Sequence, residues 1–429
     1  MTTFAGLPRS EPIDMGFCPS RLAHLVQTMD AAVERRAIPG VATVIARGGK
    51  VIHAQSHGYL DIERQTPLGL DAIYRMYSQT KPVTAALLMM LQEDGLLFLD
   101  DPISKFLPEF ANRTVACHKP ALGKARGELS TGVDAEPARR EITVIDLLTM
   151  TSGLPSQSRT PMGLSHLVDR AWRGSGFMAN DPRPINDPPG SYEDMVLALA
   201  NAPLHAQPGE TWQYGSDFDV LTLLIERATG ESLLETMRKR VFEPLGMRDS
   251  AFYCSADRID RLVTEHQWDE RGQVIVRDRP DTTEKAGRSE RRLISGNGMF
   301  GGMLSTAADY TRFAQMLLNR GELDGVRVLG RKTVELMTAN HLGGREIDLV
   351  VGPGYGFGFG YAVRASMTRS ALPGSIGTYG WGGAAGTWFF VDPTEDLIGL
   401  FFTHVFGYQF SPTADLFHRF EKLTYEALV

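Results

Sequence analysis

The chain has 429 residues, of which 43% are hydrophobic and 22% charged, and its formal net charge is -7. This is the composition of an ordinary soluble protein with a sizeable core, and the acidic balance argues against nucleic acid as a partner. No run approaches the roughly 18 apolar residues of a membrane-spanning helix, and the N-terminus lacks the pattern of a signal peptide. We therefore expect no membrane partner.

The three cysteines, Cys18, Cys117 and Cys254, are scattered and odd in number. They offer neither a disulfide framework nor metal-ligand spacing, and they are typical of reduced thiols in a cytoplasmic protein. The sequence also lacks H-E-x-x-H, Walker-type and G-x-S-x-G motifs. It therefore predicts no metal and no cofactor.

The chain begins with a predicted helix, a hairpin and a second helix. Apolar spacing indicates an amphipathic helix over residues 21–36, and two strands over residues 40–55 flank the turn pair Gly48-Gly49. The segment from Tyr77 to Lys81 then opens an apolar run, residues 83–91, that is typical of a buried helix.

The middle of the chain is predicted to be helical and rich in loops. A short helix over residues 143–150 is capped by Thr143, and a stronger helix over residues 217–229 ends at Gly230. The loop-like segments share polar, glycine-rich or proline-rich composition and cover residues 112–140, 155–190 and 265–292. We expect the last two to shape the walls of a cleft.

The last third combines a helix, several strands and a terminal helix. The predicted helices cover residues 301–318 and 414–426, and the predicted strands cover residues 355–363, 378–382, 387–391 and 397–404. Strands at both ends of the chain predict an α+β protein with one sheet built from both termini. Residues 1–75 and 295–429 would form this sheet lobe, and residues 76–294 an inserted, mostly helical lobe, with the active site in the cleft between them.

Ser78 and Lys81 are the first candidate functional residues. Three positions apart on a helix, their side chains share one face. A serine hydroxyl is a weak nucleophile until a neighbouring base takes its proton, and burial disfavours the charged form of a lysine that could act as that base.

Two further segments fit such a site. Tyr214 lies just before the predicted helix at residue 217, where a phenol could act as acid and base, although a tyrosine more commonly packs with its hydroxyl toward water. The segment from Tyr379 to Thr387 contains glycines that mark a close approach to the backbone, by a substrate or by a neighbouring element.

The order Ser-x-x-Lys, tyrosine and glycine-rich strand resembles that of serine β-lactamases and penicillin-binding proteins. The chain is similar to class C β-lactamase-like esterases, the family VIII carboxylesterases, and to the related lovastatin acyltransferase. The resemblance extends to the runs Ile142–Leu154, Pro208–Tyr214 and Pro244–Met247. It implies an antiparallel sheet flanked by helices and a small-molecule ester as the substrate.

The resemblance also implies a role for each residue. Ser78 would be acylated, and Lys81 and Tyr214 would share the acid–base work, with the base left open between them. The segment Trp381-Gly382-Gly383-Ala384 would take the place of the family's Lys-Thr-Gly-Ser strand and bind substrate. The backbone N–H groups of Ser78 and Ala384 would hold the oxyanion.

Two departures from β-lactamases favour ester hydrolysis. Ser216 replaces the asparagine that follows the tyrosine by two residues, and Trp381 replaces the lysine that attracts a penicillin carboxylate. We therefore predict a serine carboxylesterase for short-acyl esters. The alternatives are an acyltransferase with the same residues, a β-lactamase or D-alanyl peptidase, and a non-catalytic binding protein of the same fold. The sequence leaves the oligomeric state open.

Overall fold

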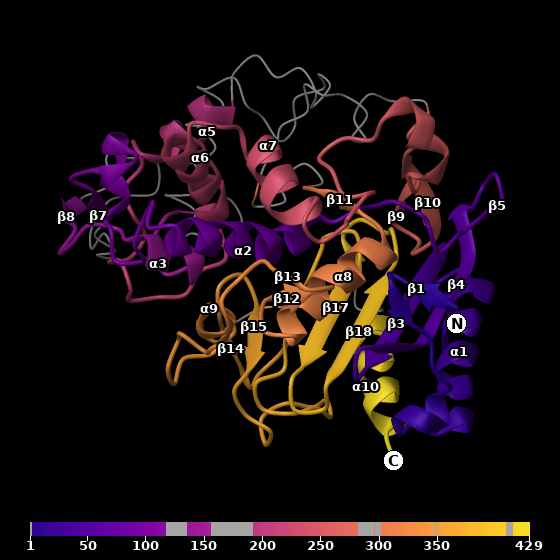
Figure 1. Ribbon diagram of the computed structural model, residues 1–429. Helices are drawn as coiled ribbons and strands as arrows, with labels where there is room; N and C mark the ends of the chain where they lie inside the picture. Colours follow the sequence, from indigo (N-terminus) through magenta and orange to yellow (C-terminus); the bar gives the residue numbers. More distant parts are fainter. Residues whose placement is uncertain are drawn as a thin grey trace, which may run out of the picture. The chain divides into compact units, whose positions relative to one another are not determined.

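The computed structural model describes residues 2–116, 135–155, 192–281, 296, 302–347, 349, 351–408 and 415–429 (Figure 1). The chain divides into two compact units, residues 1–93 with 232–429, and residues 94–231. Among the described residues, no helix combines the length and the apolar character needed to cross a bilayer.

An eight-stranded antiparallel sheet is the centre of the first unit. Its strands, in spatial order, are β14 (Tyr355–Phe357), β15 (Ala362–Arg364), β16 (Tyr379–Gly382), β17 (Thr387–Asp392), β18 (Leu397–Phe402), β3 (Gly40–Arg47), β4 (Lys50–Asp61) and β5 (Thr66–Pro67). Neighbours pair antiparallel throughout, and β3 pairs with β18. The predicted sheet built from both ends of the chain is confirmed.

Helices and short strands complete the first unit. The helices are η1 (Pro12–Met15), α1 (Pro19–Glu34), η2 (Tyr77–Gln79), α2 (Thr80–Glu93), α7 (Leu233–Met237), η5 (Arg238–Phe242), η6 (Ala256–Arg261), α8 (Ala307–Leu318), α9 (Arg331–Met337) and α10 (Leu416–Glu426). The short strands are β1 (Thr3–Phe4), β2 (Leu7–Pro8), β6 (Tyr74–Arg75), β9 (Glu265–Trp268), β10 (Val274–Asp278), β11 (Leu304–Ser305), β12 (Glu322–Leu323) and β13 (Val326–Arg327).

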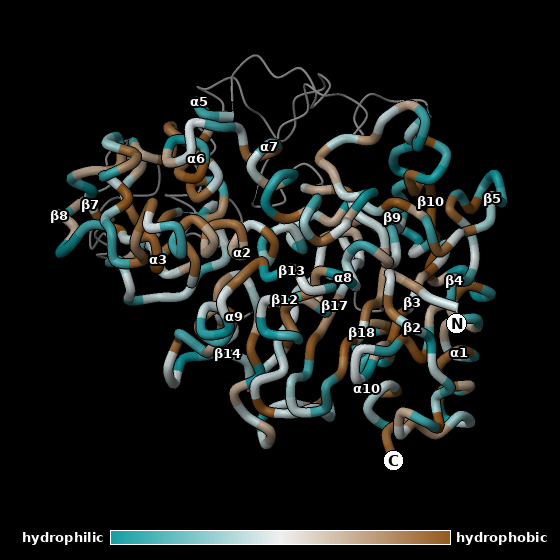
Figure 2. Tube along the Cα trace, viewed as in Figure 1, coloured by the Kyte–Doolittle hydropathy of each residue, from teal (hydrophilic) through white to brown (hydrophobic). Residues whose placement is uncertain are grey.

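Alternating aromatic side chains explain why the central strands are buried on both faces. Successive residues of a strand point to opposite faces. Phe389 and Phe402 contact Tyr310 of α8, with ring centroids 5.0 and 6.0 Å away. Phe390 and Phe401 instead contact Phe420 of α10. Helices therefore pack on both faces, and β3 and β18 are strongly hydrophobic along their length (Figures 1 and 2).

The second unit is mainly helical in its described part. It contains η3 (Ile103–Lys105), η4 (Pro108–Phe110), β7 (Thr114–Ala116), β8 (Ala135–Pro137), α3 (Val144–Leu148), α5 (Tyr192–Leu199) and α6 (Asp217–Thr229). The predicted caps are present: Thr143 and Asp146 form a capping box at α3, and Gly230 ends α6 with φ +69°. Asp146 therefore has a structural role.

Several predicted elements differ in the structure. The predicted strand over residues 355–363 is two strands, because the chain turns between β14 and β15, where Gly360 has φ +82°. The predicted loop over residues 265–292 begins with the β9–β10 hairpin. Residues 112–140 include the paired strands β7 and β8. Cross-strand pairing forms these short strands within stretches of mostly polar composition.

Parts of the predicted segments lie outside the described residues. These parts are residues 117–134, 156–190 and 282–292, together with Gly301 and Ala414. The helix predicted from residue 301 begins at Ala307, since Thr306 caps it and Leu304–Ser305 pairs with β6.

The two units divide at Glu93 and Ser232, whereas the sequence pattern predicted boundaries after residues 75 and 294. Helix α2 belongs with the sheet-containing unit, since the Met303 N–H donates to Thr80 Oγ1 and Tyr310 of α8 donates to the carbonyl of Gln79, just before α2. Glu93 at the end of α2 likewise accepts from the backbone of Gly330.

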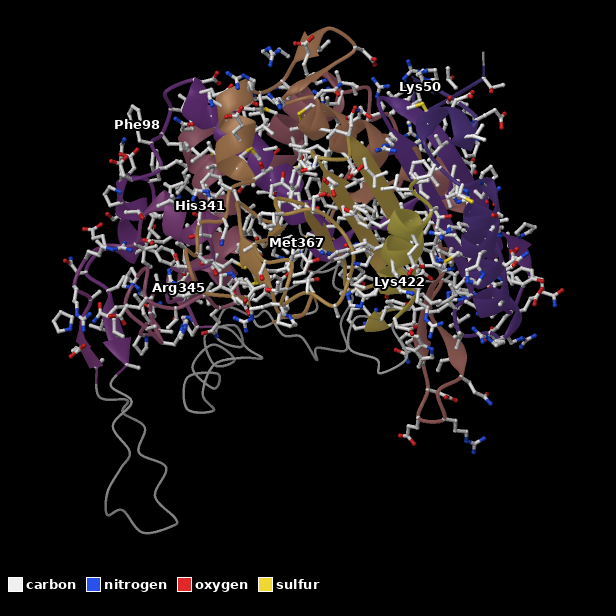
Figure 3. The ribbon with its side chains drawn as sticks, turned by 90° about the horizontal axis from the view of Figure 1, so that it is seen from below. Lys50, Phe98, His341, Arg345, Met367 and Lys422 are labelled. Atoms are coloured by element: carbon white, nitrogen blue, oxygen red, sulfur yellow. The ribbon has the colours of Figure 1, made fainter. Side chains whose placement is uncertain are left out.

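A buried ion pair ties α10 to the sheet. Arg364 of β15 is fully buried and lies 3.5 Å from the Glu421 carboxylate. Its guanidinium also donates to the Tyr355 hydroxyl at 2.8 Å and to the Leu372 carbonyl at 2.7 Å. At the other end of the β14–β15 hairpin, His341 (labelled in Figure 3) stacks on Phe359, with ring centroids 4.4 Å apart.

We expect Arg364→Met to destabilise the fold by roughly 3 kcal/mol, because it leaves buried acceptors without their donor. Thermal unfolding of the full chain measures the loss. Arg369→Met is the matched control, since Arg369 lies in the loop that carries Met367 (Figure 3), is 62% exposed and pairs with Glu346, and we expect it to cost less than about 1 kcal/mol. Equal melting temperatures for the two variants would contradict this.

Candidate active site

Ser78 and Lys81 lie on one continuous helical segment of the first unit. η2 runs directly into α2, because Thr80, the first residue of α2, has helical angles, φ -68° and ψ -32°. The spacing of three residues places the two side chains on one face. Ser78 is half-buried and Lys81 is only 1% exposed. The prediction that Lys81 begins a buried helix is confirmed.

The residue before Ser78 has an unusual backbone conformation. Tyr77 has φ +45°, a left-handed value that costs a bulky residue about 1–3 kcal/mol. The Tyr77 hydroxyl donates to Glu265 Oε1 at 2.5 Å, and Glu265 forms an ion pair with Arg277. Burial, and then the Glu265 carboxylate, raise the pKa of Tyr77 well above its ordinary value. The phenol therefore keeps its proton and remains a donor.

The glycine-rich strand lies against the segment that precedes Ser78. A Cβ added to Gly383 would lie 2.3 Å from the Met76 carbonyl oxygen, and one added to Gly380 would lie 2.1 Å from the Phe389 carbonyl. The close approach expected at these glycines is therefore made by neighbouring backbone. The segment 381–384 and Ser78 are brought together within one unit, as β16 contacts η2.

The ends of this segment have different surroundings. Trp381 is 4% exposed, and its ring contacts Phe357 of β14 edge-on at 5.4 Å. Ala384 is half-buried, and its carbonyl accepts from the Gly407 N–H at 2.8 Å. The turn after β16 is thus held by the stretch that follows β18.

Tyr214 belongs to the second unit, where two motif runs bind each other. The Gln213 N–H donates to the Met150 carbonyl at 3.0 Å, and the Gly209 N–H donates to Thr151 at 2.7 Å. The run 208–214 is therefore fixed against the run 142–154. Tyr214 is half-buried, with its ring 6.5 Å from that of Trp212, and α6 begins three residues later.

A buried carboxyl group opens the helix that follows Tyr214. Asp217 is 1% exposed and accepts a hydrogen bond from Ser152 Oγ at 2.6 Å. Burial raises the pKa of Asp217 to about 7, and Asp146 and Asp219 add to the effect. Asp219 also accepts from the Tyr192 hydroxyl at 2.6 Å, so it orients a side chain of α5.

Sequence reasoning missed Glu265, Arg277 and Phe406, which surround Tyr77. Phe406 packs on Tyr77 with ring centroids 5.6 Å apart. No motif marks these residues, since their meeting depends on the β9–β10 hairpin and on the stretch after β18. Within the described ranges, no group of three or more histidine, cysteine or carboxylate side chains could hold a metal ion.

The sheet between helices, with Ser-x-x-Lys opening a buried helix and a glycine-rich strand beside it, defines a class of serine hydrolases. The chain matches the Beta-lactamase family over residues 25–423 and belongs to that family. It is a beta-lactamase-family serine hydrolase, related to esterases.

Three relatives illustrate the similarity. The chain is 29% identical to esterase EstB of Burkholderia gladioli, with 90% of this chain and 91% of EstB covered. It is 30% identical to the lovastatin esterase of Penicillium rubens, with 87% and 90% covered. The solved structure of EstCE1, a hydrolase with promiscuous acyltransferase activity, has a TM-score of 0.74 and 26% identity, with 95% of this chain and 99% of that one covered.

The raised pKa of Asp217 predicts a pH-dependent stability. Its folded value of about 7 exceeds the ordinary 3.8, so the folded state holds the proton more tightly. The stabilising contribution is complete below about pH 4 and is lost as the pH rises through 7. A shift of about three units corresponds to an upper bound of about 4 kcal/mol.

We expect Asp217→Asn to remove the fall in folding stability that Asp217 causes as the pH rises, and so to stabilise the protein at pH 8 relative to the parent. Denaturant unfolding between pH 4 and pH 8 measures the effect. Asp257→Asn changes an exposed carboxylate in the same way and should leave the pH dependence unchanged. A parallel fall in stability for the parent and the Asp217 variant would refute the prediction.

Proposed function

We propose that the protein is a serine carboxylesterase that hydrolyses short-acyl esters through an acyl-serine intermediate. The observation that carries the proposal is the placement of Ser78 and the buried Lys81 on one helical face beside the segment 381–384. The names of EstB and the lovastatin esterase support ester chemistry.

The reaction needs two acyl transfers. Ser78 Oγ attacks the ester carbonyl and loses its proton to Lys81 or Tyr214, which then protonates the leaving alcohol. Water attacks the acyl-serine in the second step, with the same groups taking and returning a proton. The backbone N–H groups of Ser78 and Ala384 stabilise the oxyanion in both steps, and such a donor is worth about 3–4 kcal/mol.

Trp381 supports an ester in preference to a β-lactam. Its indole is uncharged and buried against Phe357, so it offers no cation to a substrate carboxylate at this position of the strand. Neutral esters need no such cation. Short acyl groups remain our expectation from the sequence.

An acyltransferase is the second candidate. The similarity to EstCE1, whose own acyltransferase activity is described as promiscuous, supports it, and the same residues would serve. The difference lies in whether water or an alcohol reaches the acyl-serine. Alcohol acceptors added during turnover should divert acyl groups from acid to new ester if transfer competes.

We expect the protein to release nitrophenol from acetyl to hexanoyl p-nitrophenyl esters with a burst, and intact mass spectrometry to show one acyl adduct. Ser78→Ala should abolish the adduct and lower turnover at least about a thousandfold, because the nucleophile is gone. Lys81→Ala should strongly lower both the amount of adduct and the turnover. Ser20→Ala, on the exposed surface of α1, is the matched control and should behave as the parent.

Unchanged turnover in a folded Ser78→Ala protein would show that another residue is the nucleophile. Faster turnover of nitrocefin than of any ester would favour the β-lactamase alternative. Absence of adduct and turnover in the parent would favour the non-catalytic binding protein.

A further inference from the structure

We propose that Tyr77, Glu265, Arg277 and Phe406, the Tyr77 cluster, are positioning residues that hold the backbone N–H groups of Ser78 and Ala384 in register for the oxyanion. The inference rests on the proposed function and extends it to residues that act through the backbone of Ser78 and Ala384. All four residues belong to the first unit.

The cluster is a closed ring of four side chains. The Tyr77 hydroxyl donates to one oxygen of Glu265, and the Arg277 guanidinium pairs with the other. The Arg277 guanidinium carbon lies 3.9 Å above the centre of the Phe406 ring, a cation–π distance. The Phe406 ring packs on the Tyr77 ring, with centroids 5.6 Å apart, and so closes the cluster. Each member therefore touches two others.

The ring is linked through the backbone to one proposed oxyanion donor, the Ser78 N–H. Tyr77 directly precedes Ser78, so its backbone conformation, with φ +45°, helps to set the direction in which the Ser78 N–H points. A left-handed bulky residue persists only where its surroundings fix it. The buried Glu265, 2% exposed, anchors the far end of the Tyr77 side chain.

The ring reaches the second donor through the stretch after β18. The Gly407 N–H donates to the Ala384 carbonyl at 2.8 Å, and the Val405 N–H donates to the Ala385 carbonyl at 2.9 Å. Phe406 lies between these two residues. Its own N–H donates to the His266 carbonyl at 2.7 Å, beside Glu265. The turn that carries Ala384 is thus coupled to the hairpin that anchors Tyr77.

Catalysis needs the two N–H donors at a fixed separation, which the stability of the fold alone does not require. The two donors come from segments about 300 residues apart in the chain, and a shift of about 1 Å at a reacting centre can cost about a hundredfold in rate. The ring includes Tyr77, next to Ser78, and Phe406, whose two chain neighbours bind the turn of Ala384, so it links the two segments.

The test compares Tyr77→Phe, Glu265→Gln and the double variant by steady-state and burst kinetics with p-nitrophenyl acetate, alongside thermal unfolding. We expect each single variant to lower kcat and the acylation rate about 10- to 100-fold while KM changes less than about threefold. The double variant should lose little more than either single variant, because Tyr77→Phe removes the donor to Glu265 and Glu265→Gln removes the charge that pairs with Arg277, so both interrupt the same chain of contacts.

Glu63→Gln is the matched control. Glu63 has an exposed carboxylate that pairs with Arg279, just after β10 in the chain, so the substitution alters a neighbouring ion pair and leaves the cluster intact. We expect kcat to stay within about twofold of the parent. Arg277→Lys keeps the charge but loses the planar stacking, and we expect an intermediate kcat.

A kcat within twofold of the parent in folded Tyr77→Phe and Glu265→Gln proteins would overturn the inference, as would a loss only in melting temperature. The Ser78 acyl adduct of the parent, measured by intact mass, separates the two proposals. If the parent forms the adduct and the variants keep the kcat of the parent, only the positioning role is rejected. If the parent forms no adduct, the proposed function is rejected and this inference with it.

Discussion

The antiparallel pairing of β3 with β18 is the constraint on which the rest of the structure depends. Leu397 pairs with Arg47 and Phe402 with Ala42, so strands from the two ends of the chain become neighbours. The entropic cost of closing so long a loop grows only slowly with its length, and the buried strands offset it. A slip of one residue would turn every side chain of β18 to the opposite face, so α8 and α10 fix the register.

This pairing also assembles the candidate site. Once β18 lies beside β3, β17 and β16 follow on its other side, and Gly383 comes against Met76. Only a residue without a side chain permits that approach. The left-handed conformation of Tyr77 is then held by Glu265. The local motif thus places Ser78 and Lys81 on one helical face, and contacts between distant segments bring the segment 381–384 beside it.

The second unit fixes the segment that carries Tyr214 by a different means. Backbone N–H groups of the run before α6 donate to carbonyls of the loop after α3, and Ser152 donates to the buried Asp217. The polar pair fixes the start of α6, three residues after Tyr214. A buried carboxyl group with a raised pKa makes this arrangement sensitive to pH, since the charged form loses its hydration.

The sequence by itself determined the local elements and the family. Periodicity located α1, α2 and α6, Thr143 and Gly230 marked helix ends, and the Ser78–Lys81 motif with its accompanying runs identified the relatives. Only the tertiary structure decided the turn between β14 and β15, the β9–β10 hairpin, the backbone neighbour of Gly383 and the partners of Tyr77. Helix periodicity and caps are set by residues a few positions apart, whereas strand register, close backbone approach and buried side-chain contacts depend on residues that meet only after the chain has folded.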